Sequence, residues 1–496
     1  MSFGENISEL VEVSKNPLMG KAAHWPRVSL GEFAVILNGF PWKSERFNNS
    51  IGTPLIRIRD VTTGQTETFY DGPITEGYWI NPGDLLVGMD GDFNVRRWSA
   101  ERGLLNQRVC KITVDPDQYD TYLLEYLLPA YLRLINQATS SVTVKHLSSR
   151  TLAELPLPIP PLPEQRRIVA KLDALTACIA RARTELNRVP MLTENFRQAA
   201  SMAAFTGMLT AEWRATNSES AQSDDELEAA AAKVAGSKRR KPPIVIDWKP
   251  NLEIPASWRW VSVDQVIAAA QYGTSSKTSD DADGVPVLRM GNIQSGELDW
   301  TSLKYLPSDH DEFPDLLLST GDVLFNRTNS FELVGKSAVF RGKPAPISFA
   351  SYLIRLRCSG IAPDLLVRYL NSPVGRAWVN RVASQQVGQA NVNGTKLKAL
   401  GFPLPPVGEQ TEMNRLLTSA FARADRFETE AARARALLDR LESAILAKAF
   451  RGELVPQDDN DEPASVLLER IRAQRASAPK PKRGRRAAGE AESTTA

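Results

Sequence analysis

The sequence is poor in the residues that build metal centres and nucleophilic sites. It contains three cysteines and three histidines. They stand far apart, at Cys110, Cys178, Cys358, His24, His146 and His310. The cysteines lack the spacing of metal ligands, and the histidines have no Cys or Glu partner at such a spacing. We therefore expect reduced thiols, no metal site and a cytosolic protein.

A strong charge excess and long apolar runs are also missing. Lys and Arg number 60 against 58 Asp and Glu, so the formal net charge is only +2. A chain this balanced is not a non-specific polyanion binder, and any nucleic-acid role must rest on local arrangement or on a partner with basic surface. No apolar run approaches the roughly 18 residues of a membrane helix, and no signal peptide opens the chain. We expect a cytoplasmic protein.

Catalytic motifs are absent as well. The segment 330–337 (SFELVGKS) resembles the end of a phosphate-binding loop, but Ser330 stands where that loop requires its first glycine. The chain lacks the Asn/Asp-Pro-Pro-Tyr/Phe element and the glycine-rich turn of adenine methyltransferases. Asp90 and Asp92 have no lysine that completes a nuclease set, so a tight turn is the better interpretation. The sequence predicts that the chain is not an enzyme by itself.

The sequence does contain a long segment that occurs twice, over 160–209 and over 405–454. The copies match without a gap, with identities at Pro160 and Pro405, Glu164 and Glu409, Gln165 and Gln410, Leu172 and Leu417, Phe205 and Phe450, and Gly207 and Gly452. An insertion would rotate everything beyond it in a helix, so an ungapped match favours two helices of one fixed length. The glycines suit left-handed C-terminal caps.

Both copies carry apolar residues spaced alternately by four and three, the pattern of a coiled-coil seam. The first seam is Ile168, Leu172, Leu175, Ile179, Ala182, Leu186, Val189, Phe196, Ala200 and Ala203. The second seam is Met413, Leu417, Ala420, Ala424, Phe427, Ala431, Ala434, Leu438, Leu441 and Ile445. One such copy could equally belong to a helix bundle or a homodimer, but two matched copies favour packing on each other. Pro190 should kink the first helix near Val189.

A globular domain precedes each helix. Residues 25–158 are short runs of β-forming residues broken by Gly, Pro, Asn and Asp, with helical signal mainly over 121–137, which predicts an α+β domain. From Trp258 the same framework returns in weaker form. Gly83-Asp84-Leu85-Leu86, for example, matches Gly321-Asp322-Val323-Leu324. Framework positions recur while the segments between them differ, as expected of one scaffold that presents two sets of loops.

The predicted organisation therefore has seven parts. They are a flexible lead-in over 1–24, a first domain over 25–158, a helical region over 159–212, a linker over 213–257, a second domain over 258–403, a second helical region over 404–455, and a short helix with a basic tail over 456–496. Residues 218–241 fit either a mobile helix or a linker, and composition favours the linker. Residues 463–474 predict the short amphipathic helix. The basic residues after it are either solvated or in transient contact with phosphate.

Candidate binding loops combine Arg and Lys with Gln, Asn, Ser and Gly, the groups that read base edges and hold phosphates. The candidate residues are Lys43, Arg57, Arg59, Arg96, Arg97 and Lys145 in the first domain, and Lys277, Arg289, Asn326, Arg327, Gln386 and Gln389 in the second. Any single Arg could instead be a surface charge or a carboxylate partner. The clusters at 140–149 and 384–393 stand at equivalent places before the two long helices, which strengthens the binding interpretation.

The Pro-Pro-Leu-Pro-Glu-Gln opening of the first helix, the Ala-Phe-x-Gly-x-Leu close and their duplication resemble the specificity subunit of type I restriction–modification systems, roughly from Trp25 to Arg472. The resemblance implies two α+β target-recognition domains separated by two long helices that pack as an antiparallel coiled coil. Each domain would read one half of a split DNA site. Base contacts do not transfer, because the recognition loops are the divergent part of such a family.

The resemblance also implies partners. Two methyltransferase subunits would dock on the helices and restriction subunits would join through them. Adenine methylation and ATP-dependent cleavage, with S-adenosylmethionine, ATP and Mg, would belong to those partners. We assign helix–helix contact and methyltransferase docking to Glu164, Gln165, Leu172, Phe205, Glu409, Gln410, Leu417 and Phe450.

Two alternatives stay open, a specificity subunit of a methylation-only system and a two-headed coiled-coil scaffold for protein ligands. In the specificity interpretation the helices act as a ruler. Four residues inserted between Gly207 and Trp213, taken as an exposed helical connection, would then lengthen the gap between the half-sites.

The absence of a cofactor motif gives a first prediction. The purified chain, incubated with DNA and labelled S-adenosylmethionine, should transfer no methyl group, and adding the cognate methyltransferase subunit should produce transfer. Filter-bound label measures the reaction. Robust transfer by the chain alone would overturn the prediction.

Overall fold

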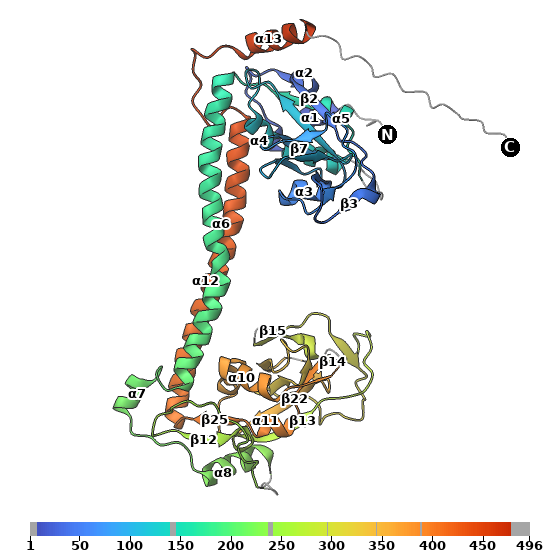
Figure 1. The fold of residues 1–496 in the computed structure, drawn as a ribbon. Coiled ribbons are helices and arrows are strands. Elements are labelled where there is room, and N and C mark those ends of the chain that lie inside the picture. The colour runs from blue at the N-terminus through green and yellow to red at the C-terminus, as the bar shows by residue number, and fades with distance from the viewer. Residues whose placement is uncertain are drawn as a thin grey trace, which may run out of the picture. The chain divides into compact units, whose positions relative to one another are not determined.

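The computed structural model describes residues 7–138, 145–236, 242–294, 296–343, 345–386 and 389–477. The chain forms two compact units, one of Met1–Leu186 with Arg433–Ala496 and the other of Asn187–Ala432. Each unit holds one globular domain and one end of both long helices (Figure 1). The predicted α+β class is confirmed, with two duplicated globular parts and two long helices.

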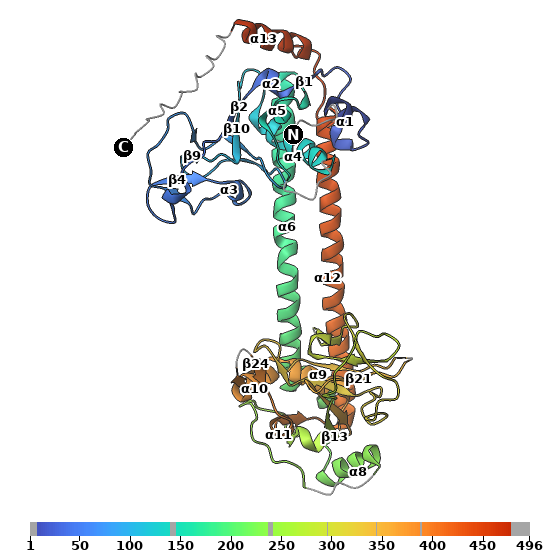
Figure 2. The ribbon, with the colours of Figure 1, turned by 90° about the vertical axis from the view of Figure 1, so that its right-hand side faces the viewer.

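The long helices are α6 (Leu162–Phe205) and α12 (Val407–Phe450), each of 44 residues, as the ungapped repeat predicts. They run side by side in both views (Figures 1 and 2). Gly207 and Gly452 follow their last turns with φ of 76° and 72°, so the predicted left-handed caps are confirmed. This backbone conformation strains any residue that has a Cβ atom.

The helices pack antiparallel within each unit. In the 187–432 unit Arg197 contacts Asp425 and Glu428 at 2.5 and 2.8 Å, and Thr193 also donates to Glu428. In the other unit Arg183 contacts Asp439 and Glu442 of α12 at 2.6 and 2.7 Å. Polar pairs therefore share the interface with the buried apolar residues of the seam.

Part of the predicted seam is wrong. Phe196 is 44% exposed and Phe427 59% exposed, and Leu441 is exposed as well. Thr193 is buried, and it meets Glu428 on the facing helix. The buried stripe of α6 thus takes two successive steps of four residues near here, a stutter that locally changes the winding of the pair. A heptad pattern of apolar residues does not predict that shift, because polar side chains form the interface.

Helix α6 continues through Pro190. Proline has no amide hydrogen, so the carbonyl of Leu186 loses its partner within the helix. The Arg435 guanidinium on α12 donates to this carbonyl instead. The Thr193 hydroxyl oxygen lies 3.0 Å from the carbonyl oxygens of both Val189 and Pro190. The neighbouring helix thus satisfies a group that the proline leaves free.

The first domain is built on a sheet with strand order β2-β10-β7-β8. Two further sheets have the orders β1-β11 and β3-β5-β4-β9-β6. The strands are β1 (Arg27–Ser29), β2 (Ala34–Asn38), β3 (Phe47–Asn48), β4 (Thr53–Ile56), β5 (Phe69–Tyr70), β6 (Trp79–Ile80), β7 (Leu85–Gly88), β8 (Val95–Arg97), β9 (Gly103–Leu105), β10 (Val109–Val114) and β11 (Pro156–Pro158). The helices of its unit, besides α6 and α12, are α1 (Ile7–Val13), η1 (Pro17–Met19), α2 (Leu30–Phe33), η2 (Ser44–Arg46), α3 (Ile58–Thr63), α4 (Thr121–Ala138), α5 (Ser149–Ala153) and α13 (Ala464–Ser477).

The second domain repeats this plan, with sheet orders β13-β22-β18-β20 and β12-β25, and adds β17-β14-β21, β15-β16 and β19-β24-β23. Its strands are β12 (Arg259–Ser262), β13 (Ile267–Tyr272), β14 (Val285–Leu288), β15 (Ile293–Gln294), β16 (Glu297–Leu298), β17 (Lys304–Leu306), β18 (Val323–Asn326), β19 (Thr328–Asn329), β20 (Ser337–Val339), β21 (Ser348–Phe349), β22 (Leu353–Cys358), β23 (Ser384–Gln386), β24 (Gln389–Asn391) and β25 (Gly401–Leu404). The helices of this unit, besides α6 and α12, are α7 (Ala211–Thr216), α8 (Asp224–Ala235), η3 (Val263–Val266), η4 (Met290–Asn292), α9 (Pro363–Asn371), α10 (Pro373–Val382) and α11 (Gly394–Lys398).

The repeated Gly-Asp motif has the same role in both domains. Asp84 accepts a hydrogen bond from the backbone of Asn81 at 2.7 Å and pairs with Lys111 of β10 at 3.1 Å. Asp322 accepts from the backbone of Ser319 at 2.9 Å and contacts Arg355 of β22 at 3.7 Å. Each aspartate therefore holds a turn onto the neighbouring strand of its sheet. Burial lowers the pKa of the Arg355 guanidinium.

The predicted flexible lead-in and linker need correction. Within 1–24, α1 and η1 place Ile7, Val11 and Met19 in the core of their unit. Within 218–241, residues 224–235 form helix α8, which Ser223 and Glu226 cap reciprocally. Leu227 and Ala231 of α8 are buried. Each segment is polar in composition, but a few apolar side chains at helical spacing are enough to dock it.

The predicted C-terminal helix is confirmed as α13, and it is the structural counterpart of α8. Leu467 and Ile471 of α13 are buried four residues apart, as Leu227 and Ala231 of α8 are. Helix α13 packs on α2, and α8 packs on η3, which occupies the equivalent place in the second domain. Each long helix is thus followed by a short helix that covers the start of a globular domain. The basic tail, including Lys480, lies outside the described residues.

The segment between Gly207 and Trp213 is only in part the exposed connection that the sequence suggested, since Met208 is exposed but other residues of the segment are buried. Thr210 is fully buried, and a Cβ atom at Gly207 would lie 2.4 Å from Pro255. Four inserted residues would therefore disrupt the packing of this unit rather than extend a free helix. No helix in the described part of the chain has the length and apolarity of a membrane span.

Candidate nucleic-acid interface

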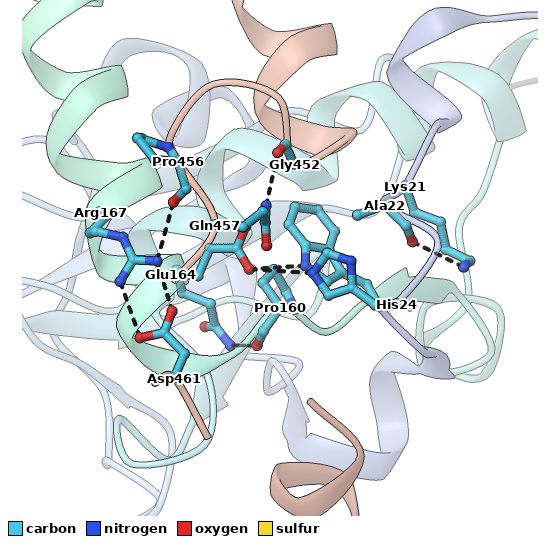
Figure 3. A network of polar contacts seen from close by, with 12 residues as sticks. Lys21, Ala22, His24, Pro160, Glu164, Arg167, Gly452, Pro456, Gln457 and Asp461 are labelled. Atoms are coloured by element: carbon cyan, nitrogen blue, oxygen red, sulfur yellow. Dashed lines mark hydrogen bonds and ion pairs between the residues drawn. The ribbon is translucent and has the colours of Figure 1, made fainter. Parts of the chain in front are cut away.

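The glutamate of the helix-opening motif is a buried connector. Glu164, in the first turn of α6, is 1% exposed. Its Oε2 accepts a hydrogen bond from the Trp25 indole at 3.1 Å, and its Oε1 accepts one from Gln457 at 2.6 Å (Figure 3). Arg167, one turn along α6, forms an ion pair with Asp461 at 2.7 Å. Figure 3 labels both residues. The start of α6 is thereby joined to the first domain and to the segment after α12.

The second copy repeats the arrangement with different partners. Glu409, in the first turn of α12, is fully buried. It accepts hydrogen bonds from the Trp258 indole at 2.7 Å and from the Thr210 hydroxyl at 2.6 Å, and it pairs with Arg214. Thr210 and Arg214 follow α6, just as Gln457 follows α12. A buried carboxylate is tolerated here because donors surround it.

The eight residues expected to join the helices and dock a methyltransferase are all buried. They are Glu164, Gln165, Leu172, Phe205, Glu409, Gln410, Leu417 and Phe450. Gln165 and Gln410 donate to the carbonyls of Pro160 and Pro405 at 2.9 and 3.1 Å. Their burial supports a role in holding each domain on the helices, and it leaves no surface for a partner to touch. The sequence analysis assigned no binding or docking role to Trp25 or Trp258.

Several predicted DNA-binding residues of the first domain are engaged inside it. Arg96 donates to the carbonyls that end α3, Val61 and Thr62, at 2.7 and 2.6 Å. Arg97 pairs with Glu125 at 3.1 Å, and its guanidinium lies 3.7 Å from the centre of the Tyr122 ring. Lys145 donates to the side chain of Asn136 at 2.7 Å.

The other three candidates of this domain are less constrained. Lys43 is exposed, and Arg59 is exposed while it donates to Thr68 at 2.8 Å. Arg57 is half-buried beside the Phe47 ring. Lys43 and Arg59 therefore stay candidates for phosphate contact. The predicted loop at 140–149 is described only from residue 145 onwards.

The candidate DNA-binding residues of the second domain likewise include some that are engaged inside the domain. Asn326 is fully buried and donates to the carbonyl of Met290 at 3.0 Å, so it does not reach the surface. Arg289 donates to the carbonyl of Ser302 at 3.1 Å. Arg327 is half-buried, with its guanidinium 4.8 Å from the centre of the Tyr272 ring.

The remaining candidates of the second domain lie on a loop and on strands β23 and β24. Lys277 is exposed, and Gln389 is exposed on β24. Gln386 ends β23, but its side chain and residues 387–388 lie outside the described part. Lys277 and Gln389 are accessible to a ligand, unlike Asn326.

The cysteines are free, as the sequence predicts. Burial raises the pKa of the Cys110 and Cys358 thiols to about 12, so both stay protonated near neutral pH. Cys178 is exposed on α6. Among the described residues no three His, Cys, Asp or Glu side chains are grouped to hold a metal ion.

Comparison with known proteins gives the family. A model described as the type I restriction modification DNA specificity domain matches residues 23–191. The type I restriction enzyme EcoBI specificity subunit of Escherichia coli is 37% identical over 96% of this chain and 98% of its own length. The chain belongs to the family of type I restriction enzyme specificity subunits.

One further relative and one solved structure are also similar to this chain. The EcoKI specificity subunit of Escherichia coli strain K12 is 25% identical over 91% of this chain and 96% of its own length. A solved chain, described in terms of complex assembly and conformational transition of the type I R-M system, covers 88% of this chain and 99% of its own length. It has a TM-score of 0.59 at 20% identity, which shows a shared fold.

The buried carboxylate generates a stability prediction. Glu409→Gln keeps the side-chain shape but turns an amide NH2 group toward hydrogen-bond donors. We expect the free energy of unfolding of the 187–432 unit to fall by about 2–3 kcal/mol, the value of hydrogen bonds to a charged group. Hydrogen-exchange mass spectrometry of the peptides at the start of α12 measures the change. Glu412→Gln is the control, because Glu412 pairs with the exposed Arg415. Equal protection in the two variants would contradict the connector role.

Proposed function

We propose that this chain selects the DNA sequence on which a type I restriction–modification complex acts, with each globular domain reading one half of a split site. The observation that carries the proposal is duplication with divergence. Both domains share the sheet order and the Gly-Asp turn, while their surface loops differ. Membership of the specificity-subunit family supports the same function. Two domains that share a fold but differ in their surface loops suit a DNA site whose two halves differ in sequence.

We propose that catalysis belongs to partner subunits. In this scheme a methyltransferase subunit binds S-adenosylmethionine and methylates adenine, and a restriction subunit uses ATP and Mg to cleave. The specificity chain recognises the DNA sequence and provides the surface on which the other subunits dock. The lack of methyltransferase, nuclease and phosphate-loop motifs in the sequence supports this division of labour.

We propose that the methyltransferase subunits dock on apolar side chains that the helix pair leaves exposed. In the 187–432 unit these are Met191, Leu192, Phe196 and Phe427. In the other unit Leu437 and Leu441 are exposed on α12. Large apolar side chains on a helix that already has a partner are typical of a second interface. Because each unit offers such residues, one methyltransferase subunit would bind each unit.

The docking surface can be tested at Phe427. We expect Phe427→Asp to weaken binding of the methyltransferase subunit at least about tenfold, because burying a Phe side chain contributes about 1.5–3 kcal/mol. Thr429→Asp is the control, since it adds the same charge to a nearly opposite face of the helix. Analytical ultracentrifugation of the mixed subunits measures the affinity. Unchanged binding of the Phe427→Asp variant would show that this part of α12 does not contact the methyltransferase subunit.

The function itself is tested by mapping methyladenine. Cells that carry this chain and its methyltransferase should modify one gapped, asymmetric motif, and deleting the 496-residue chain should abolish that modification. Single-molecule sequencing of the genomic DNA reads the motif directly. The protein-scaffold alternative predicts no motif at all. A methylation-only system predicts the motif without restriction of unmodified phage, which a plating assay distinguishes.

A further inference from the structure

Three chain segments meet at the end of the main sheet of the first domain. The amide of Met89, just after β7, donates to the carbonyl of Arg108 at 3.0 Å. The amide of Leu147 donates to the carbonyl of Met89 at 2.7 Å. Asp90 and His146 form an antiparallel bridge. The main chain therefore fixes the relative positions of the three segments.

The same three segments meet in the second domain. The amide of Arg327, just after β18, donates to the carbonyl of Tyr352 at 3.0 Å. The amide of Val392 donates to the carbonyl of Arg327 at 2.9 Å. Thr328 and Asn391 are antiparallel partners. We name these places the reading corners, residues 89–90, 108 and 146 in the first domain and 327–328, 352 and 391 in the second.

The reading corner of the first domain presents two hydrogen-bond donors around an acid. Asp90 Oδ1 lies 2.7 Å from His146 Nδ1, and Asp90 Oδ2 lies 3.5 Å from a guanidinium nitrogen of Arg108. The Arg108 and His146 side chains are 53% and 52% exposed. An exposed ion pair contributes little to stability, so the fold does not require these residues.

The reading corner of the second domain presents different chemistry on the same main chain. The Asn391 amide donates to the Thr328 hydroxyl at 2.8 Å. The Arg327 guanidinium lies against the exposed ring of Tyr272. The side chain of Tyr352, which belongs to the corner, is also exposed. An amide, a stacked guanidinium and a phenol replace the imidazole and guanidinium of the first domain.

All four positions of the corner differ between the domains, although their backbone hydrogen bonds are the same. Residues that hold the scaffold behave in the opposite way. Trp25 and Trp258, like Glu164 and Glu409, are identical and make equivalent contacts. A fixed backbone with variable side chains, of which Arg108, His146 and Tyr352 are exposed, is what reading two different sequences needs.

We infer that the reading corners determine the base specificity of the two half-sites, with Arg108 and His146 acting in the first domain and Tyr352 and Asn391 in the second. The inference rests on the proposed function and names the residues that carry it out. Arg108 suits a bidentate contact with the O6 and N7 atoms of guanine, and Asn391 suits the edge of adenine. The Asn391 amide is held by Arg327 and Thr328, so its side chain loses little conformational freedom on binding.

The test uses the assembled methyltransferase complex and a library of DNA duplexes randomised across the modified motif. With Arg108→Ala we expect discrimination at one position of one half-site to fall about tenfold or more, while the other half-site stays unchanged. Asn391→Ala should relax the opposite half-site only. Arg150→Ala is the control, because Arg150 is exposed on α5 and pairs with Glu154. It should leave both half-sites unchanged.

Each other outcome overturns a defined part of the argument. Unchanged preferences in both variants, with normal methylation, would place base reading elsewhere and leave the proposed function intact. A uniform loss across all sequences would show phosphate contact instead of base reading. A wild-type complex with no sequence preference would instead overturn the proposed function. If Arg108→Ala fails to assemble, Arg108→Lys serves, because it keeps the charge but cannot make the planar bidentate contact.

Discussion

The structure depends on a buried carboxylate at the start of each long helix. Removing a charge from water is costly unless donors surround it, so Glu164 and Glu409 require specific partners in the folded chain. One partner is the indole that opens the globular domain, and another comes from the segment that follows the opposite long helix. That second donor is within reach only if the two helices run antiparallel. One residue type therefore links the domain, its helix and the neighbouring helix within each unit.

This constraint explains how two domains can diverge without losing their common fold. The groups that hold the scaffold are repeated, as in the half-buried Asp84–Lys111 pair and the buried Asp322–Arg355 pair. The backbone of the reading corners, by contrast, is set by main-chain hydrogen bonds, which any side chain other than proline permits. Substitutions there change recognition at little cost in stability.

The helix pair shows how polar groups decide which apolar residues remain outside. Pro190 leaves the Leu186 carbonyl without its helical donor, and Arg435 supplies one from α12. Nearby, Thr193 and Arg197 meet Glu428 across the interface. With these polar contacts in the interface, Phe427 is turned outward. The same contacts that join the helices thus create the exposed apolar surface that a further subunit would need.

The sequence by itself determined the duplication, the length and ends of both long helices, the α+β class and the family, because each leaves a local or repeated pattern. It did not determine the helix seam near Phe196 and Phe427, since polar pairing moved the buried stripe. The sequence also did not show that helix α8 buries apolar side chains. It did not show that the side chains of Asn326 and Arg96 are engaged within the protein. The tertiary structure alone assembled the reading corners, because Met89, Arg108 and Leu147 are distant in sequence and main-chain hydrogen bonds join their segments. Such bonds leave no mark on side-chain identity, so no sequence pattern reveals them.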